Sequence, residues 1–421
     1  MLLLLVGVFI LGYIIIAFEH TIKIDKSAIA LITGVLCWVV YILNIDSVHT
    51  GIEQLYHHVG EIASILFFLL GAMAIVELID LHNGFDIIIS KVQTKSKFKF
   101  LWIIGVTTFI ISSVLDNLTT AIVMSSLIVK VLPDKEDRLW FVSVVVLAAN
   151  AGGAFSPLGD VTTTMLWIGG QITASQVILK LFIPSVAVLV IPLIIISQKF
   201  KNQTFQLNAS VESSIHKNDS LLVLGSGIFF LLFVPVFKTL THLPPFMGIL
   251  LALGILWILV SILHRKKPVD IKEKLSVASS LERIDTPSIL FFLGILLAVS
   301  TLASSGYLKL LAIQCDQYLV NFYGTGIALG LISAIVDNVP LVAAAQGMYD
   351  LNTFPTDHPF WLFLALTSGT GGSIIIIGSA AGVAAMGIEN INFMWYLRKF
   401  SLLALLGFIS GIVVFFICNG F

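Results

Sequence analysis

The sequence predicts an all-α polytopic membrane protein, built as an inverted repeat of two five-helix halves. Of its 421 residues, 58% are hydrophobic and only 11% are charged, whereas about a quarter of the residues in a soluble domain are charged. Apolar runs close to the length needed to cross a bilayer recur along the chain. Landmarks of the first half also return in the same order in the second half.

Ten membrane spans are expected. Their approximate ranges are 1–18, 27–43, 60–80, 139–169, 175–197, 220–237, 246–263, 286–302, 360–388 and 396–418. The first range lacks the basic start and the cleavage site of a secretory signal, so we expect a first span there. The ranges 139–169 and 360–388 are too long and too rich in glycine for regular helices, and we expect each to hold a broken helix.

Two further segments, 100–131 and 323–350, are expected to enter the membrane without crossing it. A continuous helix of about 30 residues would be about 45 Å long, which exceeds the roughly 30 Å thickness of the hydrocarbon core. Re-entrant hairpins solve this problem. They place the pairs Asp116-Asn117 and Asp337-Asn338 at the hairpin tips.

The distribution of basic residues supports this topology. With the N- and C-termini outside and both hairpins re-entrant, all Lys and Arg residues except Lys180, Lys238 and Lys309 fall in cytoplasmic loops. Such a bias is the pattern that the positive-inside rule describes. We therefore expect a multi-pass protein of a bacterial-type plasma (inner) membrane.

The two halves correspond at four landmarks, one of which is the acid three residues before a serine, Glu61 in the first half and Asp285 in the second; the other three are pairs of stretches. These are Ser64-Ile-Leu-Phe-Phe68 with Ser288-Ile-Leu-Phe-Phe292, Asp116-Asn117 with Asp337-Asn338, and Gly152-Gly153 with Gly371-Gly372. Each half holds five spans, an odd number, so the second half must insert upside down relative to the first. The expected division is a first repeat at 1–200, a cytoplasmic connector at 201–219 and a second repeat at 220–421.

Three acidic residues lie in the hairpins and the first break: Asp116, Asp160 and Asp337. On the membrane-insertion scale each costs about 2.5–3.5 kcal/mol at a helix centre. A proton or a bound cation offsets this cost, and each expels the other because a nearby cation favours the ionised carboxyl group. The pattern favours exchange of a cation for protons, chiefly at Asp116 and Asp160, with Asp337 as a second ligand or a cap.

Side chains with oxygen atoms, which suit the hard cation Na⁺, surround these acids. The first half supplies Ser112, Asn117, Thr119, Thr120, Asn150, Ser156, Thr162 and Thr163, and the second half supplies Ser333, Asn338, Ser373 and Ser379. We expect Na⁺ to bind through Asp116, Asn117 and Asp160. Glu61 and Asp285, each three residues before a landmark serine, are further candidates.

Structural roles compete with these assignments. A hydroxyl group in a membrane helix often bonds to a carbonyl one turn earlier, and Asp116 and Asp337 could each cap the helix that follows. Glu61 and Asp285 could stabilise helix N-termini. The sequence contains no His/Cys cluster with zinc spacing, no nucleotide-binding glycine pattern and no basic patch, so we expect neither a cofactor nor a nucleic-acid partner.

The motifs around the acids are specific in combination. They comprise Asp116-Asn117 followed by Thr119-Thr120, the stretch GGAFSPLGDVTT after Asn150, and Asp337-Asn338 followed by SGTGGS. Together, and over nearly the whole chain, they resemble the NhaD-type Na⁺/H⁺ antiporters of the ion transporter superfamily. The resemblance implies exchange of cytoplasmic Na⁺ or Li⁺ for external protons, activity at alkaline pH, and a homodimer with elevator-like motion.

The resemblance also implies a set of polar site residues. In this sequence they are Asp116, Asn117, Asn150, Asp160, Thr162 and Thr163, with Ser333, Asp337 and Asn338 opposite. The dicarboxylate transporters of the superfamily usually carry Ser-Asn-Thr at the hairpin tips. This chain has Asp in place of that Ser at both tips, which disfavours an anionic substrate.

The sequence therefore predicts a secondary active Na⁺(Li⁺)/H⁺ antiporter rather than an enzyme. A Na⁺-coupled transporter of dicarboxylates or other anions from the same superfamily is the alternative. An intramembrane aspartyl hydrolase is a more remote alternative. The inverted repeat and the oxygen-rich breaks argue against it, because both are typical of transporters.

Overall fold

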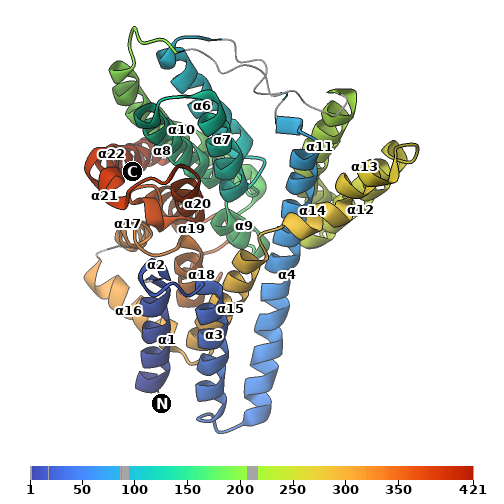
Figure 1. The fold of residues 1–421 in the computed structure, drawn as a ribbon. Helices are drawn as coiled ribbons and strands as arrows, with labels where there is room; N and C mark the ends of the chain where they lie inside the picture. The colour runs from blue at the N-terminus through green and yellow to red at the C-terminus, as the bar shows by residue number, and fades with distance from the viewer. Residues whose placement is uncertain are drawn as a thin grey trace.

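The structure, a computed structural model, describes residues 2–17, 19–85, 87, 94–205, 217–319 and 321–420. Within these ranges every regular element is a helix and no β-strand forms (Figure 1). Six of the described helices are long and apolar enough to cross a membrane by length and composition. The prediction of an all-α polytopic membrane protein is confirmed to this extent.

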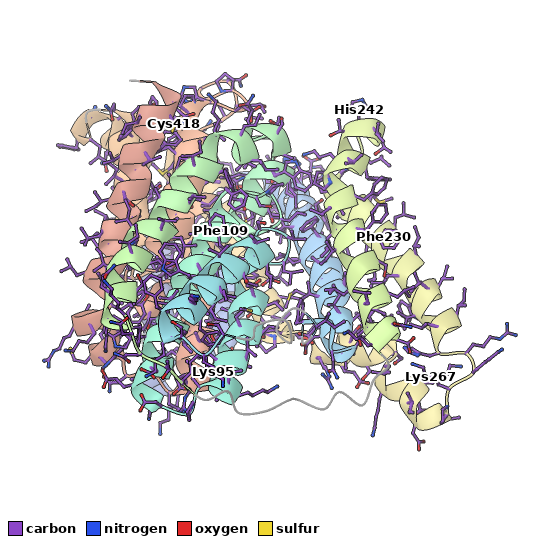
Figure 2. All side chains as sticks on the ribbon, turned by 90° about the horizontal axis from the view of Figure 1, so that it is seen from above. Lys95, Phe109, Phe230, His242, Lys267 and Cys418 are labelled. Carbon is purple, nitrogen blue, oxygen red and sulfur yellow. The ribbon has the colours of Figure 1, made fainter. Side chains whose placement is uncertain are left out.

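The helices pack into two bodies, which we call the panel and the bundle. The panel consists of α1 (Leu2–Ala17), α3 (Lys26–Ile42), α4 (Val48–Leu81), α11 (Lys217–Thr241), α12 (Pro245–Leu263) and α15 (Thr286–Ser304). In Figure 1 the panel occupies the lower and right parts of the molecule. Seen from above in Figure 2, α11, which carries Phe230 and ends just before His242, lies on the opposite side from Cys418.

The bundle contains both segments that carry an Asp-Asn pair. It consists of α6 (Lys97–Ser112), α7 (Asn117–Val131), α8 (Lys135–Ala154), α9 (Val161–Ile168), α10 (Ala174–Lys199), α17 (Phe322–Ile332), α18 (Asn338–Met348), α19 (Pro359–Gly371), α20 (Ala380–Glu389) and α22 (Ser401–Asn419). Short helices complete the chain: α2 (Glu19–Ile22), α13 (Val269–Lys274), α14 (Val277–Arg283), α16 (Tyr307–Tyr318), the 3₁₀ helix η1 (Ile376–Gly378) and α21 (Phe393–Lys399).

Helices occur at all of the expected spans, although not always as one continuous helix. The six long apolar helices are α4, α10, α11, α12, α15 and α22. The expected spans 1–18 and 27–43 correspond to the shorter apolar helices α1 and α3. Each range expected to hold a broken helix contains two α-helices, with α8 ending before α9 begins and α19 ending before α20 begins.

Helix α4 differs from the prediction because it begins well before residue 60. Ser47 caps its start, with the hydroxyl oxygen accepting a hydrogen bond from the backbone N–H of Thr50 (3.4 Å). Glu61 therefore lies inside a continuous helix, and a role at the helix N-terminus is wrong for this residue. The same role is confirmed for Asp285, whose Oδ1 accepts a bond from the backbone N–H of Ser288 at the start of α15 (3.2 Å).

Packing between the two halves of the chain is reciprocal. In the panel, α3 packs against α15 and α4 packs against α12. In the bundle, α7 packs against α20 and α9 packs against α18. Each body thus draws helices from both halves, and each of these contacts has a counterpart with the halves exchanged.

Close backbone approach joins each hairpin to the broken helix beside it. A Cβ atom on Gly152 of α8 would lie 2.2 Å from the carbonyl oxygen of Phe109 in α6. A Cβ atom on Gly371 of α19 would lie 2.0 Å from the carbonyl oxygen of Gly330 in α17. Only glycine fits at these crossings, which is why the glycine pairs recur in both halves.

Candidate functional site

Each Asp-Asn segment is a pair of helices joined by a short turn, and an aspartate caps the second helix. Oδ1 of Asp116 accepts a hydrogen bond from the backbone N–H of Thr119, and Oδ2 accepts one from the Thr119 hydroxyl group (both 2.7 Å). Oδ1 of Asp337 accepts a bond from the backbone N–H of Val339 (3.1 Å). Both aspartates are therefore helix caps, and Thr119 supports the first of them.

The serines that precede the turns have a structural role. The Ser112 hydroxyl donates to the carbonyl of Ala149 in α8 (2.6 Å), and the Ser333 hydroxyl donates to the carbonyl of Ser368 in α19 (2.7 Å). Both serines are fully buried. Each fastens its hairpin to the neighbouring broken helix, and neither hydroxyl is directed at the carboxylates.

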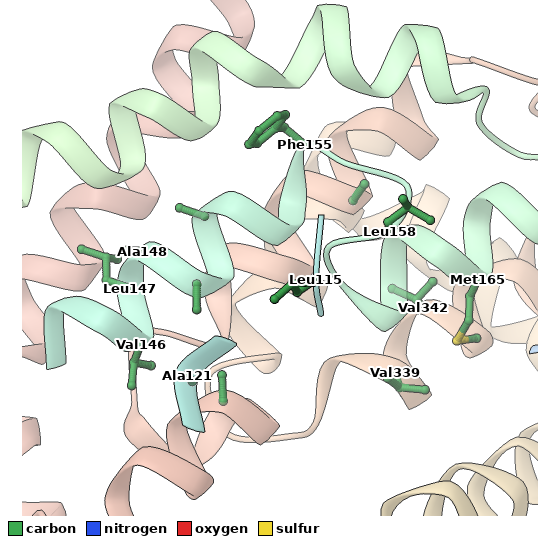
Figure 3. Close-up of a cluster of buried hydrophobic side chains, with 14 of the residues drawn as sticks. Leu115, Ala121, Val146, Leu147, Ala148, Phe155, Leu158, Met165, Val339 and Val342 are labelled. Carbon is green, nitrogen blue, oxygen red and sulfur yellow. The ribbon is translucent and has the colours of Figure 1, made fainter. Parts of the chain in front are cut away.

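Asp160 lies in the break between α8 and α9 and caps α9. Its Oδ1 accepts hydrogen bonds from the backbone N–H and the hydroxyl of Thr162 (both 2.9 Å). The Thr163 hydroxyl donates to the carbonyl of Asp160 (2.9 Å) and so stabilises the break. Phe155 and Leu158 of this stretch belong to a cluster of buried hydrophobic side chains (Figure 3), and only 1% of Asp160 is exposed.

The asparagines of both hairpin tips converge on Asp160. Nδ2 of Asn117 lies 3.0 Å from Oδ2 of Asp160. Nδ2 of Asn338, which comes from the second half of the chain, lies 3.3 Å from the same oxygen atom. Asp160 therefore serves both hairpins, although its position in the sequence associates it only with the first.

Asn150 of α8 extends this network to the second broken helix. Its Oδ1 accepts a hydrogen bond from Nδ2 of Asn117 (3.0 Å). Its own Nδ2 donates to the hydroxyl oxygens of Ser373 (2.8 Å) and Ser379 (2.9 Å). Because all four residues are almost fully buried, the network fixes the positions of the side chains behind the carboxylates.

The three acids line one cavity of about 40 Å³ between the panel and the bundle. The other polar residues of its wall are Asn117, Asn338, Thr164 and Ser288. Among the described residues no Lys, Arg or His side chain lines it. One water molecule needs about 10–15 Å³, so the cavity can hold a small cation with water but, in this conformation, no dicarboxylate.

Glu61 lies elsewhere, in a larger cleft of about 760 Å³ between the same two bodies. This cleft is reached from the N-terminal half of α4, and His58, Ser64 and Lys309 also line it. Nδ1 of His58 lies 3.2 Å from a carboxylate oxygen of Glu61. The cleft and the cavity of the three acids use successive turns of α4 and α15, which places them next to each other.

The remaining candidates do not face the cavity. Ser156 accepts a hydrogen bond from the backbone N–H of Leu158 within the break (3.3 Å). Thr120 is buried, and its hydroxyl has no hydrogen-bond partner within the described residues. Asp285 caps α15 but does not line the cavity, whereas Ser288 in the next turn does.

Two residues of the cavity wall, Thr164 and Ser288, were not predicted. Thr164 ends the run of three threonines after Asp160, so that run was the available signal. Ser288 and Ser64 each begin a copy of the same stretch, Ser-Ile-Leu-Phe-Phe. Ser64 lines the large cleft and Ser288 lines the cavity, a difference that only the packing of the two bodies creates.

Comparisons with known proteins place the chain among membrane transporters. A family model described as "Citrate transporter" matches residues 13–369. "Sodium/proton antiporter 2" of Arabidopsis thaliana is 46% identical over 420 residues, which cover 98% of this chain and 98% of that protein. "Sodium/proton antiporter 1" of the same plant is 47% identical over 412 residues, covering 96% of this chain and 70% of that protein.

A bacterial relative with lower sequence identity is also named as a sodium/proton antiporter. "Na(+)/H(+) antiporter NhaD" of Alkalimonas amylolytica is 31% identical over 438 residues, which cover 97% of this chain and 89% of that protein. The likeness therefore extends over the panel, the bundle and the cavity between them.

Proposed function

Because this chain belongs to the citrate transporter family and, within it, is a sodium/proton antiporter, we propose that Asp116, Asp160 and Asp337 form the site where Na⁺ and protons compete. The chain is a multi-pass membrane transporter and not an enzyme, and the two ions are its substrates rather than cofactors. The observation that carries the proposal is the convergence of three carboxylates on a cavity whose described lining includes no basic side chain.

Competition at this site follows from electrostatics. A carboxylate enclosed by apolar surface must be protonated, or must have a cation beside it, to avoid an uncompensated charge. Asp116 and Asp160 are proposed to alternate between these two states, with Asp337 as a further ligand across the cavity. A Na⁺ ion that enters displaces protons, and protons that return release Na⁺.

The asparagines supply the remaining ligands of the ion. In this conformation Asn117 and Asn338 direct N–H groups at Asp160. Rotation of an amide group exchanges its NH₂ for its carbonyl oxygen, so each asparagine can turn an oxygen towards Na⁺. Asn150 holds Asn117 in place, Thr162 orients Asp160, and Thr163 supports the backbone of the break.

An anionic substrate is disfavoured by the same geometry. The family model is described as "Citrate transporter", but the cavity of this chain is acidic and small. A di- or tricarboxylate would meet three carboxylates and no basic side chain among those described. The charge of the site therefore favours a cation.

The reciprocal packing supports an inverted repeat at 1–200 and 220–421. Contacts such as α3 with α15 and α4 with α12 are expected when two similar halves are related by a two-fold axis in the membrane plane. The turns before Asp116 and Asp337 suit re-entrant hairpins. Together with the distribution of Lys and Arg, this favours N- and C-termini on the outer face of an inner membrane.

The proposal includes properties that the resemblance implied. Li⁺ is expected as a second transported cation because it is also a hard monovalent ion. Activity is expected to rise at alkaline pH, where fewer protons compete for the carboxylates. We also propose a homodimer, in which the panel is held still while the bundle moves.

Everted membrane vesicles with an acid interior test this function. Added Na⁺ or Li⁺ is expected to dissipate the pH gradient, whereas K⁺ and succinate leave it intact. Asp116→Asn is expected to abolish the response because an amide cannot exchange a proton for a cation. Asp270→Asn, at an exposed position of α13, is the matched control and keeps wild-type activity.

Two results would contradict the proposal. One is accumulation of labelled succinate with no effect of Na⁺ on the pH gradient, which would indicate an anion carrier. The other is full Na⁺/H⁺ exchange by Asp116→Asn in vesicles that contain a normal amount of the protein.

A further inference from the structure

Lys238 joins the panel to the helix that carries Asp160. It lies in the last turn of α11, and its Nζ donates a hydrogen bond to the carbonyl oxygen of Trp167 in α9 (2.8 Å). The same Nζ lies 4.8 Å from the centroid of the Trp167 ring. Lys238 is half-buried and Trp167 is 2% exposed. The ammonium group of Lys238 therefore contacts the carbonyl and the ring of Trp167 at the boundary between the panel and the bundle.

The contact is placed at the C-terminal end of α9. Carbonyl groups there lack partners within the helix and carry partial negative charge, so a cation is favourable at this position. Trp167 also meets Phe68 of α4 edge to face, with ring centroids 6.2 Å apart. Phe68 lines the cavity of the three acids, so the contact of Lys238 is adjacent to the wall of the site.

Helix α9 connects this contact to the carboxylate. It runs from Val161 to Ile168, with Asp160 as its cap at one end and Trp167 in its last turn. Eight residues of α-helix span about 12 Å, and so short a helix moves as a rigid unit. Whatever holds Trp167 therefore also sets the position of Asp160 relative to the panel.

We propose that Lys238 is a positioning residue of the exchange site: it holds α9, and through it Asp160, against the panel in the present conformation. The proposal rests on the exchange function and the movement of the bundle proposed above. When the bundle moves relative to the panel, α9 leaves Lys238 and both contacts with Trp167 break. Lys238 thereby favours one arrangement of the two bodies over the other.

Lys238→Met is the informative variant because it keeps most of the apolar stem and removes the charge. A charge-assisted hydrogen bond of this kind shifts a conformational equilibrium by about tenfold. We expect a change of several-fold in the KM for Na⁺ that is not matched by the change in kcat. Lys238→Arg should restore the wild-type values, because a guanidinium group also donates to a carbonyl and stacks on tryptophan.

Cysteine labelling reports the arrangement of the bodies independently of transport. Ser64→Cys, on the α4 wall of the large cleft, is introduced into full-length protein that lacks Cys37, Cys315 and Cys418. Lys238→Met is expected to change several-fold the rate at which a water-soluble thiol reagent modifies this position. Lys180→Met, at an exposed site of α10, should leave the rate unchanged.

The outcomes separate this inference from the proposed function. If wild-type protein shows no Na⁺/H⁺ exchange, the proposed function fails, while labelling still tests the contact. If exchange is normal and Lys238→Met changes neither the ratio of kcat to KM nor the labelling rate, the inference is overturned. If Lys238→Met lowers the melting temperature, a second variant, Trp167→Phe, tests the inference. It keeps the hydrogen bond to the carbonyl but weakens the contact with the ring, so it must change the labelling rate in the same direction as Lys238→Met, by a smaller factor.

Discussion

At the scale of single residues, Asn150 is one of the buried side chains that join the two halves of the chain beside the cavity. Its amide group accepts from Asn117 and donates to Ser373 and Ser379, and it is fully buried. A buried amide with three satisfied hydrogen bonds is costly to remove because the three bonds are lost together in a place that water does not reach. This explains why an asparagine rather than another carboxylate is suited to the centre of the network.

Asn150→Ala is therefore expected to weaken Na⁺ binding. Loss of buried hydrogen bonds costs about 1–3 kcal/mol, which corresponds to an increase of about 5- to 150-fold in KM for Na⁺. Ser143→Ala in the same helix is the control, because the Ser143 hydroxyl bonds only to the carbonyl of Leu139 one turn earlier (2.7 Å). An unchanged KM for Asn150→Ala would show that the network does not position the ion ligands.

A second residue-scale feature is the buried pair His82 and His264, which follow the last residues of α4 and α12. Their Nε2 atoms lie 2.8 Å apart, and Nδ1 of His82 donates to the carbonyl of Leu78 (2.7 Å). Burial lowers the pKa of both imidazoles, and that of His264 falls to about 4, with the Lys267 charge adding to the effect of burial. Burial therefore favours the neutral form of both imidazoles in the folded protein.

The pair predicts that acid destabilises this corner of the panel. In the unfolded chain the His264 imidazole becomes protonated below about pH 6.5, whereas in the folded protein it stays neutral down to about pH 4. The neutral imidazole therefore contributes its full stability above pH 6.5, and this contribution is lost as the pH falls. We expect the melting temperature to drop between pH 6.5 and 4, and His264→Phe to reduce this slope. His49→Gln, at an exposed position, should retain the full slope.

At the scale of elements, glycine crossings decide how closely the hairpins approach the broken helices. Helix α6 crosses α8 at Gly152 and α17 crosses α19 at Gly371, with no room for a side chain at either crossing. The bonds from Ser112 and Ser333 lie at the same crossings and fix the hairpins in place. The position of Asp116 and Asp337 at the cavity thus depends on helix contacts that involve neither carboxylate.

Gly152→Ala tests this dependence. The added Cβ would lie 2.2 Å from the Phe109 carbonyl, so α6 must shift, and such overpacking costs about 1–3 kcal/mol. We expect a lower melting temperature and a several-fold loss of exchange. Gly225→Ala in α11, where nothing lies within 4 Å of the added atom, should be neutral or slightly stabilising, since alanine favours helix by up to about 1 kcal/mol.

At the scale of the whole molecule, a mostly buried ion pair joins the two halves within the bundle. Nε of Arg138 in α8 lies 2.9 Å and 3.0 Å from the two carboxylate oxygens of Glu389, the last residue of α20. The Glu389 side chain is 3% exposed. The pair is thus largely removed from water and links segments that are far apart in the sequence.

Glu389→Gln is expected to destabilise the bundle strongly. Removing one partner of a buried pair leaves the other charge uncompensated and costs about 3–5 kcal/mol. The exposed pair of Lys199 and Glu136 provides the comparison, because Glu136→Gln should cost no more than about 1 kcal/mol. Equal melting temperatures for the two variants in detergent would contradict this account.

The sequence by itself determined the class of the protein and the positions of the helix breaks, and it singled out the three acids that line the cavity. These features are local: hydropathy selects the helices that cross a membrane, glycine and proline interrupt them, and an acid in an apolar stretch is conspicuous. For the same reason the caps at Asp116 and Asp337 could be foreseen from their neighbouring residues alone.

Only the tertiary structure decided which of these residues meet. It brings Asn338 to Asp160 and Asn150 to Ser373, places Glu61 in a separate cleft, and adds Ser288 to the cavity wall. Each of these facts depends on the packing of helices that are distant in the chain. A local pattern of residues does not predict which face of one helix contacts another helix. The residues that line the cavity are therefore known only once the panel and the bundle have packed together.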